Sequence, residues 1–289
     1  MKHINTRSET NQKKLSKITK KTGIYLSLLA MSFIFLVPFM WMVSTSLKDS
    51  SEIFQFPPQW IPNPVVWSNY IEAMTFAPFH RFFANSFIIA TLSMIGEVFT
   101  GALVAYGFAK LEFKGRNVLF IVVLATMMLP GEVTMIPVFI MFSSIGWVDT
   151  FLPLIVPSYF GGGAFFIFML RQFFLGIPNE LEEAARMDGC NTFQIFYRIV
   201  LPLSKPALAV VAIFSFHGKW NDFLGPLIYL NSMENYTVQL GLAMFQGMFQ
   251  TEWSLLMAAS IVALLPVLII FFVFQKYFIE GIKLTGVKG

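Results

Sequence analysis

The sequence has few charged residues and only one cysteine. Charged residues make up 12% of its 289 residues, whereas soluble domains carry about a quarter. The mean hydropathy is +0.67, and 56% of the residues are hydrophobic. Too little polar surface would remain to cover a soluble core, so the composition excludes a soluble globular protein. Cys190 has no second cysteine to pair with, which excludes an intrachain disulfide.

The sequence also lacks the motifs of nucleotide hydrolysis and metal catalysis. No G-x-x-x-x-G-K-[ST] phosphate loop is present, because Trp220 follows the only Gly-Lys pair. There is no H-E-x-x-H motif, and His3, His80 and His217 lie far apart in the chain. We therefore expect no catalytic residue, no metal site and no cofactor in this chain.

Long apolar runs dominate what is present. Because a membrane-spanning helix needs about 20 apolar residues, six runs qualify, and they predict an all-α, polytopic membrane protein with six transmembrane helices. Pro130 and Gly131 predict a break inside the third run. The expected domains are a basic tail (1–21), one six-span domain (22–275) and a C-terminal tail (276–289). The six runs lie near 22–46, 83–109, 118–143, 151–170, 207–229 and 254–275.

Lysine and arginine positions predict the orientation of these spans. With the N-terminus inside, all of the 20 basic residues except Lys48, Arg81 and Lys219 fall in inner segments. By the positive-inside rule, both termini are then cytoplasmic. This bias accounts for the net charge of +4 without a nucleic-acid partner. The N-terminal lysines are typical of a topology anchor beside anionic lipid.

Two outer segments are candidate platforms for an external partner. Segment 47–82 is rich in prolines and aromatic residues, and 230–253 is the other long outer loop. Trp60 and Trp67 in the first segment also fit the aromatic belt of a membrane interface. Segment 47–82 is therefore either a lid lying on the membrane or a docking platform.

Three acidic residues fall within predicted spans, and one of them, Asp222, is expected near the outer interface. A charged side chain such as Asp costs roughly 2.5–3.5 kcal/mol at a helix centre on insertion scales. Glu97 and Glu132 must therefore pair, face a polar cavity or lie near an interface. Such acids would also serve a proton-coupled secondary carrier, which stays open as an alternative function.

A polar segment, Glu180 to Pro206, interrupts the apolar sequence on the predicted cytoplasmic side. Its glutamates suit a helix N-terminus, where the helix dipole favours acids. Gly189 predicts a turn, and Leu201-Pro202 predicts the end of a second helix. On its own, this pattern is also typical of an ordinary interfacial amphipathic segment.

The spacing in this segment resembles the signature of permeases of ABC-type importers. Glu183-Ala184-Ala185 is followed after three residues by Gly189. After nine further residues come Ile199, Leu201 and Pro202. Residues 170–189, 220–227 and 284–289 extend the similarity to the carbohydrate-uptake permeases of the maltose-type group, specifically their six-span partner.

The resemblance implies the type I importer permease fold in a bacterial or archaeal cell membrane. It implies a second related permease as heterodimer partner, two copies of a cytoplasmic ATPase that binds ATP and Mg, and an external sugar-binding protein. The chain itself would be a transport subunit and not an enzyme, and its loop (171–206) would couple ATPase closure to translocation.

The resemblance also implies roles for individual residues. Glu183 would contact the ATPase by charge, with Ala184 and Ala185 in the ATPase groove. Asp188 and Gly189 would form the turn, and the second helix would be fixed to the next span by Ile199, Leu201 and Pro202. The C-terminal tail that would reach the ATPase comprises Thr285, Gly286, Val287, Lys288 and Gly289.

A translocation path is a further expectation. Trp220 and Tyr229 would stack on sugar faces and Asn221 would form hydrogen bonds, while Glu132 would lie beside the path at the helix break. For the aromatic residues, the alternative is an interfacial belt.

Overall fold

The computed structural model describes residues 5–247 and 251–286, with side chains over 20–247 and 251–276. All the regular secondary structure in the described residues is helical, and no β-strand occurs among them. This confirms the all-α prediction. The chain divides into two units, one of residues 1–71 with 252–261 and one of 72–251 with 262–289.

The first unit contains α1 (Asn5–Ser46), whose portion from Lys20 is long and apolar enough to cross a membrane. Beyond α1, this unit includes η1 (Ser50–Glu52) and the start of α2 (Ser68–Thr75). Lys48 is buried here. Its Nζ donates to the carbonyl of Gln59 at 2.5 Å and lies 4.2 Å above the Trp41 ring. Burial lowers the pKa of Lys48, and the charge of Glu52 opposes that shift.

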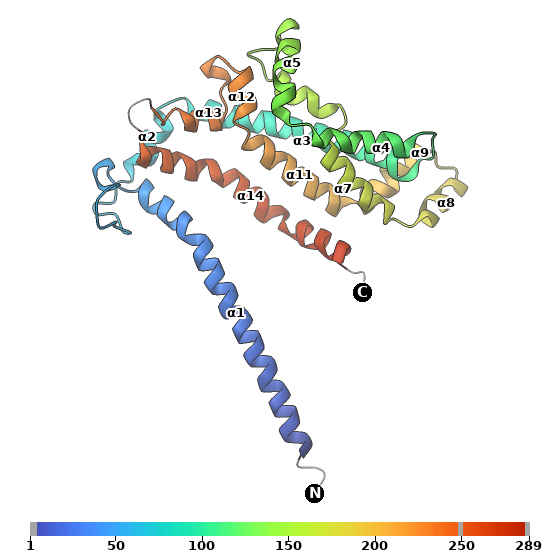
Figure 1. Cartoon of the computed structure of the whole chain (residues 1–289), viewed down its shortest axis with the longest axis horizontal. Coiled ribbons are helices and arrows are strands. Elements are labelled where there is room, and N and C mark those ends of the chain that lie inside the picture. The colour runs from blue at the N-terminus through green and yellow to red at the C-terminus, as the bar shows by residue number, and fades with distance from the viewer. Residues whose placement is uncertain (1–4, 248–250, 287–289) are drawn as a thin grey trace. The chain divides into compact units, whose positions relative to one another are not determined.

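The second unit is built around α3 (Phe79–Lys110), which lies beside α7 (Ala164–Leu175) and α11 (Lys205–Trp220) (Figure 1). Small residues on α3 let its neighbours approach closely. A Cβ on Gly96 would lie 2.7 Å from the Tyr159 ring, so that position has no room for a larger side chain.

The third predicted span is bent. It consists of α4 (Arg116–Ala125), η2 (Thr126–Met128) and α5 (Gly131–Ser144). The chain bends by 96° between its two halves. The break falls at Pro130-Gly131, as predicted. Pro130 is extended at ψ 135° and ends one helical run before the other begins.

The fourth predicted span is also interrupted, which the sequence analysis did not predict. It contains α6 (Leu152–Ile155), η3 (Val156–Tyr159) and then α7. Between η3 and α7, the residues Gly161, Gly162 and Gly163 all have positive φ. A Cβ on Gly162 would lie 2.5 Å from the carbonyl oxygen of Glu97 on α3, so the break allows two backbones to approach closely.

The described elements that follow α11 are short helices and then one long helix. Within the described residues, four helical stretches are long and apolar enough to cross a membrane, and counting each bent pair as one span gives up to six. The second bent pair consists of residues 192–203 and α11, and the chain bends by 80° between them. The elements after α11 are α12 (Leu224–Tyr229), η5 (Met233–Asn235), α13 (Val238–Ala243) and α14 (Trp253–Gly286).

Asp149 joins two connections within the second unit, both of which are predicted to lie outside. Its carboxylate accepts hydrogen bonds from the backbone N–H groups of Asn231 at 3.0 Å and Ser232 at 2.9 Å, and from the Ser232 hydroxyl and the Asn235 amide. These bonds hold the pKa of Asp149 well below its usual range, the Ser232 hydroxyl being the largest cause. The connection after α5 is thereby tied to the connection after α12.

Candidate functional site

The polar segment folds as a helix, a turn and a second helix. Its first helix, α8 (Asn179–Met187), begins directly after Pro178 and carries Glu180 and Glu182 in its first turn. The two sides of α8 differ sharply. Glu182 and Ala185 are buried, whereas Glu183, Ala184 and Met187 are exposed, Met187 at 88%. One face of α8 is therefore packed against the protein and the other is open.

The predicted turn is present at Gly189, whose φ of +81° is readily adopted only by glycine. Its N–H donates to the carbonyl of Arg186 at 3.0 Å, and the N–H of Cys190 donates to that of Ala185 at 2.9 Å. No atom lies within 4 Å of where a Cβ on Gly189 would stand. Backbone conformation, and not space, therefore requires glycine here.

The second helix begins with a capping box, in which the Asn191 and Gln194 side chains each accept from the other's backbone N–H. It comprises α9 (Thr192–Ile195), a π-helical turn η4 (Phe196–Val200) and α10 (Leu201–Leu203). Ile195, Phe196 and Val200 are buried in the core of the second unit. The Phe196 ring lies 5.1 Å from that of Tyr106 on α3, which secures this helix to the spans.

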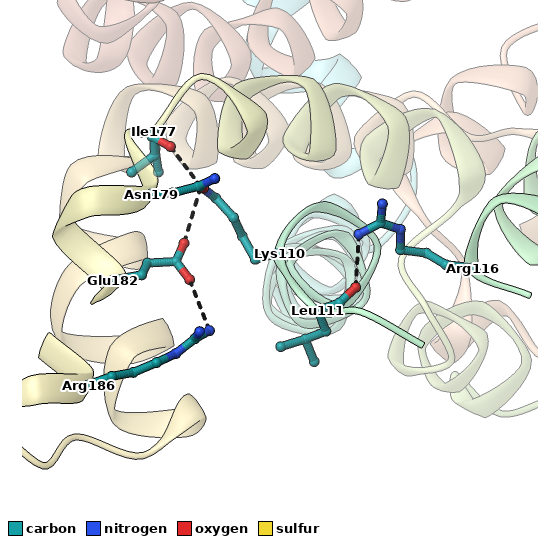
Figure 2. Close-up of polar contacts among 7 residues, drawn as sticks. All are labelled: Lys110, Leu111, Arg116, Ile177, Asn179, Glu182 and Arg186. Atoms are coloured by element: carbon teal, nitrogen blue, oxygen red, sulfur yellow. Dashed lines mark hydrogen bonds and ion pairs between the residues drawn. The ribbon is translucent and has the colours of Figure 1, made fainter. Parts of the chain in front are cut away.

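Lys110, the last residue of α3, joins that helix to α8 (Figure 2). Its Nζ donates to the carbonyl of Ile177 at 2.7 Å and to Oδ1 of Asn179 at 2.8 Å. It also lies 3.2 Å from Oε1 of Glu182. The other Glu182 oxygen lies 3.9 Å from Arg186. We call the contacts of Lys110 with Ile177, Asn179 and Glu182 the α3–α8 joint.

A pocket of about 470 Å³ opens at the joint. Arg116 enters it from the start of α4 and donates to the carbonyl of Leu111 at 3.0 Å (Figure 2). Acids and bases are present in similar numbers, so the pocket has no strong net charge. Its lining residues are Ala109, Lys110, Leu111, Glu112, Arg116, Asn179, Glu182, Glu183 and Arg186.

The sequence analysis missed Lys110 and Glu182 and treated the two alanines as equivalent. Only Ala184 presents its methyl group outward, because Ala185 is buried in the core. Helical spacing could have separated them, because Glu182 and Ala185 are three residues apart and therefore share a face. Among the other predicted residues, Asp188 and Pro202 are exposed, while Ile199 and Leu201 are half-buried beside the core.

The predicted path residues do not gather at one open surface. Trp220 is buried, stacks on Phe216 and donates its Nε1–H to the carbonyl of Ala263 at 3.1 Å. Tyr229 is also buried, with its ring 5.6 Å from that of Phe142. Neither ring offers a free face to a solute in this arrangement.

The polar members of the predicted path remain accessible. Asn221 and Glu132 are exposed, and Glu132 lies in the first turn of α5, where the helix dipole favours an acid. They lie on different elements, so a path formed by these residues stays a prediction.

Glu97 has an ion-pair partner. Its Oε1 lies 3.8 Å from Nζ of Lys219 on α11 and accepts a hydrogen bond from the Ser158 hydroxyl at 3.3 Å. Pairing was one of the arrangements expected for an acid within a span, and Glu97 is paired with Lys219.

The predicted C-terminal contact lies mostly beyond the described residues. Thr285 and Gly286 form the last residues of α14. Val287, Lys288 and Gly289 lie outside the described residues, so their role stays a prediction.

Comparisons with known proteins cover both the loop and the α3–α8 joint. The family model "Binding-protein-dependent transport system inner membrane component" matches residues 97–284. The arabinooligosaccharides transport system permease protein AraQ of Bacillus subtilis is 37% identical over 272 residues, covering 93% of this chain and 96% of that protein. The diacetylchitobiose uptake system permease protein NgcG of Streptomyces coelicolor is 32% identical over 251 residues, covering 86% and 83%.

A solved structure has a similar fold. A chain of a bacterial ABC transporter involved in the import of the acidic polysaccharide alginate superposes with a TM-score of 0.78 at 25% identity. The alignment covers 90% of this chain and 97% of the other. These similarities support the importer interpretation, and they give no support to the proton-coupled alternative.

Proposed function

Because this chain belongs to the family of binding-protein-dependent transport system inner membrane components, we propose that it is the permease subunit of an ATP-driven importer of sugars. Oligosaccharides are the favoured class of substrate. Relatives that carry arabinooligosaccharides and diacetylchitobiose support this class, as does the likeness to the alginate importer.

The two-sided character of α8 is the observation that carries the proposal. Its inner face is fixed by the α3–α8 joint and by Ala185, while Glu183, Ala184 and Met187 are exposed. Phe193 and Tyr197 on the second helix are exposed as well. A helix held on one side and open on the other can receive a partner and transmit its displacement.

The partner on that face is a cytoplasmic ATPase, present in two copies. ATP and Mg are bound by the ATPase, and this chain contributes the docking surface. Glu183 supplies charge, Ala184 allows close approach, and Asp188 and Gly189 form the projecting turn. The half-buried side chains of Ile199 and Leu201 connect the second helix to α11, and Pro202 lies near the junction of these two helices.

The other partners are a second related permease and an external sugar-binding protein. With both termini cytoplasmic, segments 47–82 and 230–253 face outward, where the binding protein would deliver sugar. Asp149 supports this arrangement because it ties the connection after α5 to residues 231–235, both of which are predicted to lie outside.

Purification of the affinity-tagged chain from its host membranes, followed by reconstitution in proteoliposomes, tests the proposal. We expect a second permease and an ATPase to co-purify, and uptake of an oligosaccharide to require ATP and the binding protein. Uptake that continued after ATP depletion but stopped with an uncoupler would refute the proposal.

A further inference from the structure

The cytoplasmic loop is attached to three spans, and only two of the attachments are covalent. It continues from α7 through residues 176–178 and leads into α11 through α10. The third attachment is the α3–α8 joint, between residues about 70 positions apart in the chain. This joint is the point at which a displacement of α8 can act directly on α3.

The joint combines two hydrogen bonds with an ion pair. An ammonium group can donate three hydrogen bonds. Lys110 donates two, to the Ile177 carbonyl and the Asn179 side chain, and forms an ion pair with the Glu182 carboxylate at 3.2 Å. The side chains of Lys110 and Glu182 are only 4% and 5% exposed. Separating a buried pair leaves an uncompensated charge, so the two helices resist moving apart.

Directed bonds do what the neighbouring apolar contacts cannot. The contact of Tyr106 with Phe196 and the burial of Ala185 hold the loop against α3, but apolar contacts are non-directional and tolerate sliding. Two hydrogen bonds and one ion pair from the same nitrogen reach a backbone carbonyl just before α8, and an amide oxygen and a carboxylate in its first turn. They fix both its position and its rotation relative to the end of α3.

We propose that Lys110 and Glu182 are positioning residues that make α3 follow α8 when a partner displaces the loop. This inference rests on the proposed function, because it assigns the span that receives the motion. Glu182 has a different role from its neighbour Glu183: Glu183 faces the partner, and Glu182 transfers the displacement inward.

The test uses Lys110→Met and Glu182→Gln in the reconstituted complex. Both remove the charged joint while keeping a side chain of similar length. Lys114→Met is the matched control, because Lys114 is an exposed base in the nearby connection between α3 and α4. Sugar transported per ATP hydrolysed is the readout, since a general loss of folded complex lowers both rates together and leaves their ratio unchanged.

We expect both joint variants to assemble with the ATPase and hydrolyse ATP, while the ratio of transport to hydrolysis falls at least tenfold. The ratio for Lys114→Met should stay within twofold of the wild-type value. An unchanged ratio in Lys110→Met and Glu182→Gln would overturn the proposal.

A chemical bridge tests the joint even if these variants assemble poorly. In a Cys190→Ser background, Lys110→Cys with Glu182→Cys can be linked by a short bifunctional thiosulfonate. Bridging should raise the transport-to-hydrolysis ratio at least fivefold, and a reductant should reverse the gain. A bridge without effect would overturn the proposal. Failure of the wild-type chain to co-purify with an ATPase would instead refute the proposed function.

Discussion

Replacing Gly189 with aspartate should weaken association with the ATPase while leaving the chain in the membrane. Gly189 has φ +81°, and a left-handed conformation costs an L-residue roughly 1–2 kcal/mol. No atom lies within 4 Å of the new Cβ, so this strain is not increased by a clash. A cost of this size shifts the equilibrium of the turn by about 5–30-fold. The new carboxylate also stands beside Asp188.

The measurement compares the amount of the chain in membranes with the amount of ATPase that co-purifies with it. Gly146→Asp is the matched control, because Gly146 is exposed, has φ +73° and has no atom within 4 Å of its Cβ position. It lies in the connection after α5, which is predicted to be on the opposite side of the membrane from the loop. Gly189→Ala separates strain from charge, and we expect it to have a smaller effect. Normal uptake and normal assembly in Gly189→Asp would refute the assignment of this turn to docking.

Three further predictions concern the loop, the break in the fourth span and the connections that Asp149 joins. Glu183→Ala should weaken ATPase co-purification only mildly, because an exposed ion pair is worth under about 1 kcal/mol; complete loss of assembly would contradict this estimate. Gly162→Ala should lower the thermal unfolding midpoint in detergent more than Gly163→Ala. Overpacking costs roughly 1–3 kcal/mol of stability, and only at Gly162 would a Cβ lie 2.5 Å from the backbone carbonyl of Glu97. Equal midpoints would count against the close approach. The pKa of Asp149 is depressed in the folded state, so its stabilisation is complete above the unfolded pKa of about 3.9 and is lost as the pH falls through that value toward the folded pKa. The difference in unfolding midpoint between wild type and Asp149→Asn should therefore be constant above about pH 5 and shrink below about pH 4, and a difference that grew on acidification would show the sign to be wrong.

Local signals predicted the loop and one of the two breaks in the spans. Gly189 specifies the turn through its backbone freedom, so the helix–turn–helix was readable from sequence. Pro202 lies inside α10, which ends one residue later at Leu203. Pro130 similarly predicted the break in the third span. The break at Gly161–Gly163 was missed because the span was placed by its hydropathy, although three consecutive glycines are a local turn signal. The close approach of Gly162 to Glu97 is a tertiary contact.

Long-range pairing explains what was missed in the candidate site. Glu182 and Lys110 are separated by many residues, and nothing local in either segment identifies the other as its partner. Trp220 was predicted to line a path because an aromatic residue near polar neighbours suits sugar binding. Its burial against Phe216 and the carbonyl of Ala263 depends on the placement of α11 and α14.

The ion pair between Glu97 and Lys219 has a consequence for how the chain enters the membrane. Glu97 is synthesised about 120 residues before Lys219, an interval of roughly 6–24 seconds at the usual rate of translation. During that interval the carboxylate lacks its ion partner, and a charge at a helix centre carries an insertion cost of a few kcal/mol. We expect a chain truncated after α7 to insert α3 less completely than the full chain, as measured by protease protection of nascent chains, and Glu97→Gln to remove the difference. Biogenesis of the second span would then be completed only when the fifth arrives.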